Sequence, residues 1–316
     1  MQRRSPRLSG AAALRLLVAG HAALALACAP RASRIDASRP TAGTTTVRGS
    51  LVIVGGGPRP AEVMERFVSL AGGPGRARVV VFPMATASAA EVGPGQAREF
   101  QQLGASAWSL DLSREQAMQD SVARSLDSAT GIWFSGGDQN RIMTVLRGTP
   151  VAAAIRARYA AGAVVGGTSA GAAIMTTPMI TGDERRPGGD RPDTSQNWLT
   201  IASDNVVTAE GLGLLEGAIV DQHFVRRRRH NRLMSLVIEH PNCVGVGIDE
   251  ATALVVEPNG WWSVVGRSAV VIYDARRGEV TQRGRVVLGA RDVRVHILPP
   301  GGRFDPRSGR AELPPD

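Results

Sequence analysis

Short apolar runs alternate with amphipathic stretches through the first half of the chain. Four of the runs have the length and composition of buried strands: Leu51–Val54, Val79–Phe82, Ile132–Phe134 and Ala163–Gly166. Apolar residues recur with helical spacing in the segments between them: 60–71, 96–103, 138–146 and 151–161. Continuous apolar strands separated by helices are typical of a parallel sheet that is covered on both faces. The pattern therefore predicts an α/β fold, a three-layer αβα sandwich with a mostly parallel sheet.

The pattern changes after residue 251, where short strands follow one another without helices. Five segments have strand character: 253–257, 261–265, 269–273, 286–290 and 293–298. Consecutive short strands of this kind predict a small antiparallel extension at the C-terminal end of the domain. We therefore expect one folded domain over residues 50–300 and a C-terminal tail at 301–316.

Residues 176–200 are rich in proline, glycine, aspartate and arginine. A structureless connection of this length is uncommon within a compact domain. Two interpretations fit it equally well: a lid that frames a substrate, and a surface insertion.

The N-terminus has the features of an export signal. Arginines within residues 1–7 precede the apolar run 16–27, which is too short for a stable membrane-spanning helix. The run leads into the sequence ALAC, which resembles the processing box of a bacterial lipoprotein. We predict a lipoprotein-type signal peptide at 1–28, acylation of Cys28 and a flexible linker at 29–49, and hence a protein of the cell envelope or the extracellular space. The alternative is a plain cleaved signal peptide without a lipid.

The net charge and the aromatic content limit the kinds of molecule that the chain is expected to bind. The formal net charge is +9, and every basic residue is arginine. Four of these arginines lie in residues 1–28, where there is no acidic residue, so the predicted mature chain carries +5. Nucleic-acid surfaces combine a basic stripe with aromatic side chains, but aromatic residues make up only 4% of this chain. We therefore expect no nucleic-acid partner, and contact with a membrane only through the lipid.

The cysteines and the motif content give no sign of a cofactor. Only Cys28 and Cys243 occur, and Cys243 lies in the apolar sequence CVGVGI, as expected of a core residue. No cluster of metal-ligating residues is recognisable, and the glycines at 55–57 are too few for a dinucleotide fingerprint. We therefore expect neither a metal nor a cofactor.

The sequence GTSAG at 167–171 fits the nucleophile-elbow pattern G-x-S-x-G between a predicted strand and a predicted helix. A sharp strand-to-helix turn leaves no room for bulky neighbours and projects the Ser169 hydroxyl clear of the sheet. The N–H of Ala170 would then face a developing oxyanion. The alternative is a glycine-rich packing turn with an incidental serine.

Two more strand ends carry groups that would complete such a site. His223 follows the apolar strand 218–222 and is the best-placed base for Ser169. Asp249 and Glu250 end a second apolar strand, and because neighbouring side chains point to opposite sides, either of the two can face the histidine.

A second glycine turn lies between the predicted strand 132–134 and the helix that starts near Asp138. Gly137 is a candidate for the other oxyanion donor, and Gln139 is placed to reach toward a substrate. The alternative is an ordinary helix start with Asp138 as its N-cap.

Four segments, FSGGDQNRI, GGTSAGAAI, DQHFVRRRRHNRL and GIDEATA, resemble in sequence and order the signature segments of the cyanophycinase family of serine peptidases, family S51. The resemblance covers roughly residues 50–275. It implies a class I glutamine amidotransferase-like fold, an acyl-enzyme mechanism and, in many members, a homodimer. The family's substrate is cyanophycin, a poly-aspartate that carries arginine on each β-carboxyl and is cut to β-Asp-Arg dipeptides.

Residue by residue, the resemblance implies Ser169 as nucleophile, His223 as base and Glu250 as acid, with Asp249 the less favoured choice. The implied substrate contacts are Gln139, Asp221, Gln222 and Arg227. The chain departs from the commonest members in its export signal, its 176–200 segment and its run of four arginines at 226–229.

Three other functions fit parts of the sequence. One is an aspartyl dipeptidase of the same family. Another is an α/β-hydrolase esterase using Ser169, Asp249 and His296, which occur in that fold's usual order, although no HGGG-type segment is present. The third is a non-catalytic surface lipoprotein that kept the fold and binds a ligand.

Overall fold

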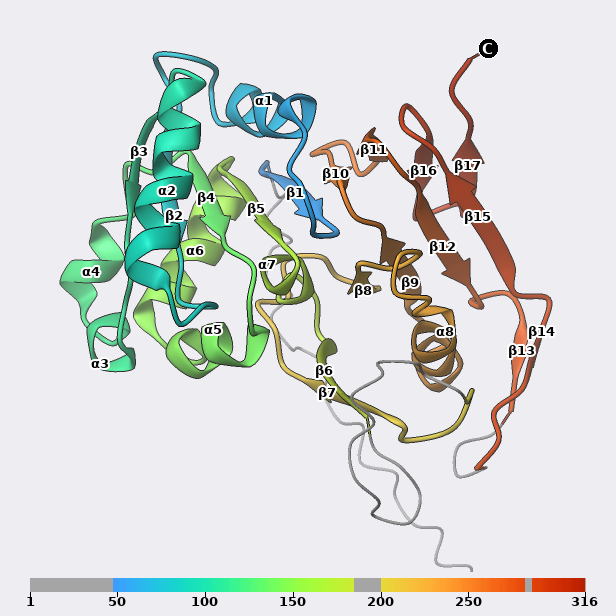
Figure 1. Ribbon diagram of the computed structural model, residues 1–316. Coiled ribbons are helices and arrows are strands. Elements are labelled where there is room, and N and C mark those ends of the chain that lie inside the picture. The colour runs from blue at the N-terminus through green and yellow to red at the C-terminus, as the bar shows by residue number, and fades with distance from the viewer. Residues whose placement is uncertain (1–47, 185–199, 282–285, 316) are drawn as a thin grey trace, which may run out of the picture. The chain divides into compact units, whose positions relative to one another are not determined.

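The apolar runs of the first half form adjacent parallel strands in the computed structural model, which describes residues 48–184, 200–281 and 286–315 (Figure 1). The parallel strands, in the order β1-β5-β4-β2-β3, are β1 Ser50–Val54, β5 Val164–Thr168, β4 Gly131–Phe134, β2 Arg78–Phe82 and β3 Ser106–Ser109. The predicted α/β fold is confirmed. The predictions for residues 1–28, including Cys28, lie outside the described residues.

Helices cover both faces of this sheet. The helices are α1 Ala61–Leu70, α2 Ala89–Gln102, α3 Arg114–Ala117, α4 Asp120–Arg124, α5 Gln139–Leu146 and α6 Pro150–Ala161. Along β1, Val52 packs in one core with Phe67 of α1, while Leu51 packs in the other core with Ile142 of α5 and Ile155 of α6. Successive strand residues point to opposite faces, so the alternation places an apolar core on each side of the sheet.

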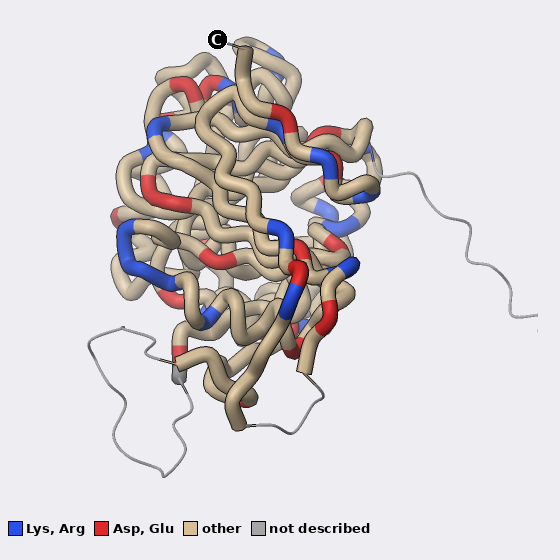
Figure 2. Tube along the Cα trace, turned by 90° about the vertical axis from the view of Figure 1, so that its right-hand side faces the viewer, with Lys and Arg blue, Asp and Glu red and all other residues tan. Residues whose placement is uncertain are grey.

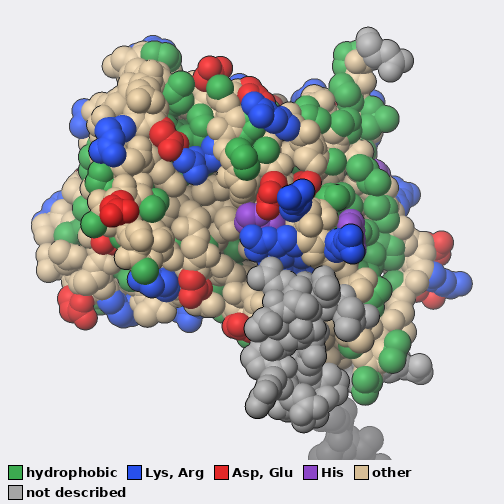
Figure 3. Space-filling view, viewed as in Figure 1, with side chains coloured by type: hydrophobic (Ala, Val, Ile, Leu, Met, Phe, Trp, Pro, Cys, Tyr) green, Lys and Arg blue, Asp and Glu red, His purple; other side chains and the backbone are tan. Residues whose placement is uncertain are grey.

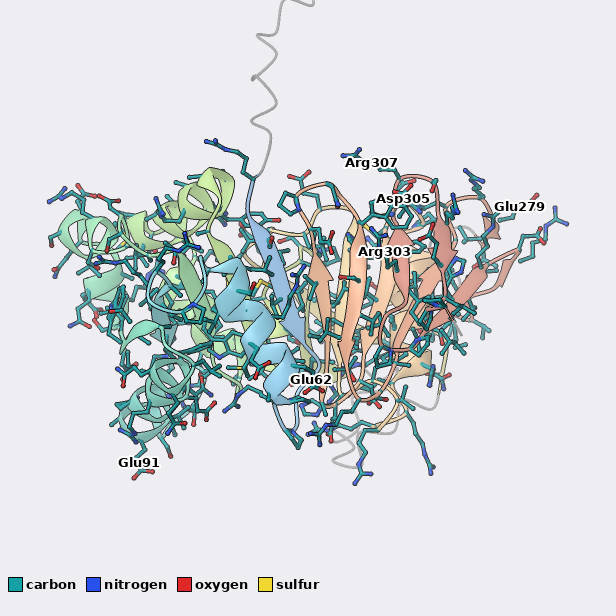
Figure 4. The ribbon with its side chains drawn as sticks, turned by 90° about the horizontal axis from the view of Figure 1, so that it is seen from above. Glu62, Glu91, Glu279, Arg303, Asp305 and Arg307 are labelled. Atoms are coloured by element: carbon teal, nitrogen blue, oxygen red, sulfur yellow. The ribbon has the colours of Figure 1, made fainter. Side chains whose placement is uncertain are left out.

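The C-terminal antiparallel extension is present and larger than expected. Its strands continue the sheet outward from β1: β10 Thr252–Val256, β11 Trp262–Gly266, β16 Arg303–Asp305 and β17 Arg310–Glu312. Residues 303–312 thus belong to the sheet instead of a tail, because Phe304 is fully buried there against Trp262. In Figure 4, Arg303, Asp305 and Arg307 of this hairpin lie in the antiparallel part of the molecule, away from Glu91 of α2 at the other end.

A second sheet holds the strands that precede His223 and Glu250. Its order is β15-β12-β9-β8, with β8 Ala218–Gln222, β9 Val244–Ile248, β12 Val270–Asp274 and β15 Arg294–Leu298. Strands β8 and β9 are parallel, and helix α8 His230–Glu239 packs on one face through Leu233 and Val237. The strands that lead to His223 and Glu250 are therefore separate from the sheet that leads to Ser169. Both edges of β1 are occupied, by β5 and β10, and β8 and β9 pair with each other in the second sheet.

The remaining elements are short. They are α7 Ala170–Ala173, the strand pair β6 Met179–Glu184 and β7 Val206–Ala209, and the pair β13 Glu279–Val280 and β14 Ala290–Arg291. The segment 176–200 therefore contains the strand β6, and its residues 185–199 lie outside the described part. The strand expected at 286–290 is reduced to a bridge at Val287 and the start of β14, and Val286 and Val287 are exposed.

Within the described residues, no helix combines the length and the apolar character that crossing a membrane requires.

Candidate active site

Ser169 occupies a strained turn between β5 and α7. Its backbone has φ 54° and ψ −106°, and its N–H donates to the Val54 carbonyl at 3.0 Å. A Cβ on Gly167 would lie 2.8 Å from the Gly171 backbone, and a Cβ on Gly171 would lie 2.5 Å from the Phe134 carbonyl. Since carbon atoms do not approach so closely, both positions require glycine. The predicted elbow geometry is present.

His223 follows β8 and meets the serine. Its Nε2 lies 2.9 Å from the Ser169 Oγ. The histidine also has a positive φ, 49°, and its N–H donates to the Gly55 carbonyl at 2.6 Å. A positive φ is energetically costly for residues other than glycine. The hydrogen bond to the Gly55 carbonyl therefore helps to stabilise the turn.

Glu250 completes a hydrogen-bonded chain. Its Oε1 lies 2.6 Å from the His223 Nδ1. The adjacent Asp249 points elsewhere: its carboxylate accepts from the Arg226 N–H at 2.9 Å and from the Ser268 Oγ at 2.7 Å. The structure therefore places Glu250 against the imidazole, while Asp249 supports the arginine-containing turn.

The glycines that follow β1 contribute to the site in a way that the sequence pattern did not predict. A Cβ on Gly56 would lie 2.3 Å from the His223 Cε1, and a Cβ on Gly57 would lie 3.0 Å from the Glu250 Cβ. The Gly56 carbonyl also accepts from the Ala251 N–H at 2.9 Å. This turn therefore packs directly against the imidazole and the carboxylate. The available signal was the run of three glycines at the end of a buried strand.

The two predicted oxyanion donors both lie beside Ser169. Ala170 is the next residue and is fully buried. A Cβ on Gly136 would lie 3.5 Å from the Ser169 Cβ, so the turn that contains Gly137 packs against the serine. Among the described residues, neither Gly137 nor Ala170 donates its N–H to a protein acceptor. Asp138 caps α5 by accepting from the Asn140 N–H at 2.8 Å, so the capping interpretation of that residue is also correct.

Gln139 does not present a free amide to a substrate. It is buried, and its Nε2 donates to the carbonyls of Ile180, at 2.8 Å, and Thr181. Both carbonyls belong to β6. Gln139 therefore ties the start of α5 to β6 in this structure.

Asp221 is also unavailable for the direct substrate contact that we expected. It is only 1% exposed, and its carboxylate is paired with the guanidinium of Arg232, whose Nε lies 2.6 Å from Oδ2. Gln222 is buried as well, and its Oε1 accepts from the Arg229 Nη1 at 2.7 Å. A buried carboxylate is stable when it is paired with a cation, so these residues form the support beneath the histidine turn.

The four consecutive arginines, seen as a continuous blue segment in Figure 2, divide into two groups. Arg229 is buried, whereas Arg226, Arg227 and Arg228 are exposed. The Arg227 N–H donates to the His223 carbonyl at 2.9 Å, which brings this predicted substrate contact to the rim of the site. Figure 3 shows arginine side chains gathered beside histidine and acidic side chains near the middle of one face.

The surroundings of His223 favour its neutral form. Burial lowers the pKa of the imidazole below its ordinary value, the hydrogen bond to Glu250 opposes this by raising the pKa, and the charges of Arg227 and Arg229 lower it further. A neutral imidazole next to a hydroxyl is the protonation state that accepts a proton. Burial and the neighbouring Arg232 also lower the pKa of Arg229 to about 10, and Asp221 partly compensates.

The esterase arrangement with Asp249 and His296 is wrong. His296 lies in β15 with its ring 5.4 Å from the Phe304 ring, and Asp249 is bonded to Arg226 and Ser268. Cys243 packs at the edge of the core around α8, and burial raises the pKa of its thiol. In the part of the chain that the structure describes, no group of three metal-ligating side chains is found.

Comparisons with known proteins identify the family of this chain. Residues 51–261 match the model of peptidase family S51. The chain is 37% identical over 252 residues to a cyanophycinase of Trichormus variabilis, an alignment covering 77% of this chain and 80% of that protein. A cyanophycinase of Geminocystis herdmanii is 34% identical over 269 residues, which cover 82% of this chain and 94% of the relative.

A solved structure supports the same assignment. The crystal structure of a peptidase from an acI-B1 Actinobacterium aligns with a TM-score of 0.57 and 26% identity, covering 73% of this chain and 93% of that one. The non-catalytic interpretation is therefore not supported. The chain belongs to peptidase family S51 and is a serine-type peptidase.

Proposed function

We propose that this protein hydrolyses cyanophycin to β-Asp-Arg dipeptides, with Ser169 as nucleophile, His223 as general base and Glu250 as the acid that orients the imidazole. The observation that carries the proposal is the hydrogen-bonded chain from the Ser169 Oγ through the His223 ring to the Glu250 carboxylate. The similarity to proteins named cyanophycinase supports the choice of substrate.

The reaction follows from the positions of these groups. The neutral His223 takes the proton of the Ser169 hydroxyl as the oxygen attacks the carbonyl of an aspartyl unit. The N–H groups of Gly137 and Ala170 stabilise the resulting oxyanion, a contribution of about 3 kcal/mol for each donor. His223 then gives the proton to the leaving amine, and a water molecule, deprotonated by the same imidazole, releases the acyl group from Ser169.

The exposed arginines suit the charge of this polymer. Each arginyl group of cyanophycin has a free α-carboxylate, and arginine binds carboxylates through paired hydrogen bonds. Arg226, Arg227 and Arg228 are exposed beside His223. They provide cations at the entrance of the site, and Arg227 is the member of the group that we propose as a direct contact.

We further propose that the protein is exported and anchored through acylated Cys28, with cyanophycin outside the cell as its substrate. The positive start, the short apolar run and the ALAC sequence support this location. Mass spectrometry of the mature N-terminal peptide tests it, since a lipid-modified Cys28 is expected. Sedimentation of the purified protein tests the expected homodimer.

The substrate is tested by incubating the purified protein with cyanophycin and identifying the products by mass. We expect β-Asp-Arg dipeptides from the native protein and none from the Ser169→Ala variant. A parallel incubation with dipeptides that carry an N-terminal α-linked aspartate separates the two activities of the family. Cleavage of those dipeptides without cleavage of cyanophycin would assign the protein as an aspartyl dipeptidase.

A further inference from the structure

A cavity lies at the carboxyl ends of β2, β3 and β4, beside the glycine turn that precedes α5. Its volume is about 500 Å³. Three segments form its walls: the loop after β2, the residues after β3, and the first two turns of α5. Ligand sites in open α/β sheets form at this edge, beyond the carboxyl ends of the parallel strands. In Figure 1, α5 and α7 both follow the lower ends of their strands, β4 and β5.

One short turn separates this cavity from the serine. Gly136 packs against the Ser169 side chain, and a Cβ on Gly137 would lie 2.3 Å from the Ala85 carbonyl. Ala85 lies in the loop after β2, and its carbonyl accepts from the Asp138 N–H at 2.9 Å. Asp138 itself lines the cavity. The turn therefore contacts the serine through Gly136 and borders the cavity through Asp138.

The charged groups of the cavity are of both signs. Asp111 and Asp138 supply two carboxylates, and Arg141 supplies one guanidinium. The structure gives no ion pair to Asp111 or Arg141 within its described residues, and both side chains are exposed. Apolar side chains complete the wall, among them Met84, Leu112 and Val145.

Resting on the proposed function, we propose that this cavity is a second substrate subsite, which binds the arginyl group of a neighbouring unit of the polymer. Such a group carries one guanidinium, one free carboxylate and an apolar methylene stem. Asp111 and Asp138 complement the guanidinium, Arg141 complements the carboxylate through paired hydrogen bonds, and the apolar wall packs against the stem. A neutral peptide side chain has neither charge, so the subsite selects zwitterionic groups.

The binding test uses the inactive Ser169→Ala protein and Nα-acetyl-L-arginine, a probe that carries the guanidinium, the carboxylate and an acylated α-nitrogen. Calorimetry is expected to show binding that weakens about tenfold in an added Asp111→Asn or Arg141→Gln substitution, since each removes a charge-assisted hydrogen bond. Nα-acetyl-L-citrulline, which has the same shape without the cation, should bind as weakly as the probe binds to the Asp111→Asn variant. Asp127→Asn, at an exposed acid outside the cavity, is the matched control and should bind like the parent.

Two results overturn the subsite: no binding of the probe by the parent protein, or equal binding by the parent and by both cavity variants. A second arm uses the active enzyme, where Asp111→Asn and Arg141→Gln should raise KM for cyanophycin about tenfold and Asp127→Asn should not. An unchanged KM in an enzyme that cleaves cyanophycin contradicts the subsite alone. Failure of the native enzyme to cleave cyanophycin contradicts the proposed function, and the probe still decides whether the cavity recognises arginyl groups.

Discussion

The turn that contains Ser169 (the serine turn) and the turn that contains His223 (the histidine turn) both need space around a residue with a positive φ. They obtain that space from different parts of the chain. In both, the functional residue directly follows a buried strand and has a positive φ, 54° at Ser169 and 49° at His223. The serine turn obtains its space from its own sequence, through Gly167 and Gly171. The histidine turn is followed by arginines, and its space comes from Gly56, at the end of the first strand.

This difference separates a turn whose geometry depends on adjacent residues from a turn whose geometry depends on residues far apart in the sequence. At the serine turn, bulky neighbours would collide with the turn itself, so the requirement for glycine is visible in adjacent residues. At the histidine turn, the colliding groups come from two sheets, and the carbonyl of Gly55 holds the strained residue through the His223 N–H. The first strand thus contacts both catalytic candidates, since the Val54 carbonyl accepts from the Ser169 N–H.

The largest expected effect comes from removing either partner of the central hydrogen bond. Ser169→Ala and His223→Ala should each lower kcat by about 10⁶-fold, and the double variant should lose little more, because the two residues act as a unit. The measurement is the rate of product release from cyanophycin. His296→Ala is the matched control, and loss of activity in that variant with activity retained in His223→Ala would contradict the assignment.

Substitution of the neighbouring acids Glu250 and Asp249 should have sharply different effects on kcat. Glu250→Gln is expected to lower kcat by about 10⁴-fold, because the imidazole loses the group that orients it and stabilises its charged form. Asp249→Asn weakens hydrogen bonds at the arginine turn and should mainly lower the free energy of unfolding, by about 1–2 kcal/mol. Turnover and thermal unfolding of both variants provide the comparison. Equal losses of kcat would show that the choice between the two acids is wrong.

Gly56→Ala tests the contribution of the first strand to the histidine turn. The added methyl group would displace the imidazole, and a misplacement of about 1 Å costs about 100-fold in rate. Gly73→Ala is a matched control, since Gly73 also has a positive φ, 84°, but has no atom within 4 Å of the added Cβ. Both variants should lose stability, and only Gly56→Ala should lose kcat. If the two variants keep the same kcat, Gly56 does not position His223.

The smallest expected effect is a shift in the pH profile. Because burial lowers the pKa of His223, its neutral, proton-accepting form persists as the pH falls below the ordinary value of histidine. The acidic limb of kcat/KM should therefore lie below that value. Arg227→Gln removes a cation that disfavours the charged imidazole, so the limb should move to higher pH, and added salt should reduce the difference between the two proteins. A limb that moves to lower pH would contradict this explanation.

Much of the molecule was predictable from local pattern. Four of the five parallel strands of the described sheet and the major helices follow from apolar runs and helical spacing, and Ser169 follows from glycines that only a tight turn requires. The fifth, β3, was not predicted, because its sequence SAWS contains no apolar run. The antiparallel strands β10, β11, β12 and β15 were recognisable from their apolar runs, whereas β16 and β17 lie in the segment that was expected to be a tail. The strand expected at 286–290 is reduced, because β propensity does not ensure a partner strand: Val286 and Val287 lie exposed.

The roles of the buried polar and charged residues were harder to predict from the sequence. Asp221 precedes the candidate base and was expected to contact a substrate, but Arg232, one turn into the next helix, pairs with it in the interior. Gln139 was expected in the same role, but its amide binds carbonyls of a strand that follows much later in the chain. Burial and partner choice depend on which elements pack together, and no local pattern contains that information.

The sequence by itself determined the α/β class, the nucleophile elbow and the set of residues from which a base and an acid had to come. The family resemblance favoured Glu250 over Asp249, but local pattern left both acids open, and the tertiary structure decided which of them faces the imidazole and that two sheets meet at the site. The physical reason is the difference in range. Backbone sterics and apolar periodicity act between neighbours in the chain, whereas Glu250 lies among segments that are far apart in the sequence, as the hydrogen bond from the Ala251 N–H to the Gly56 carbonyl after the first strand shows.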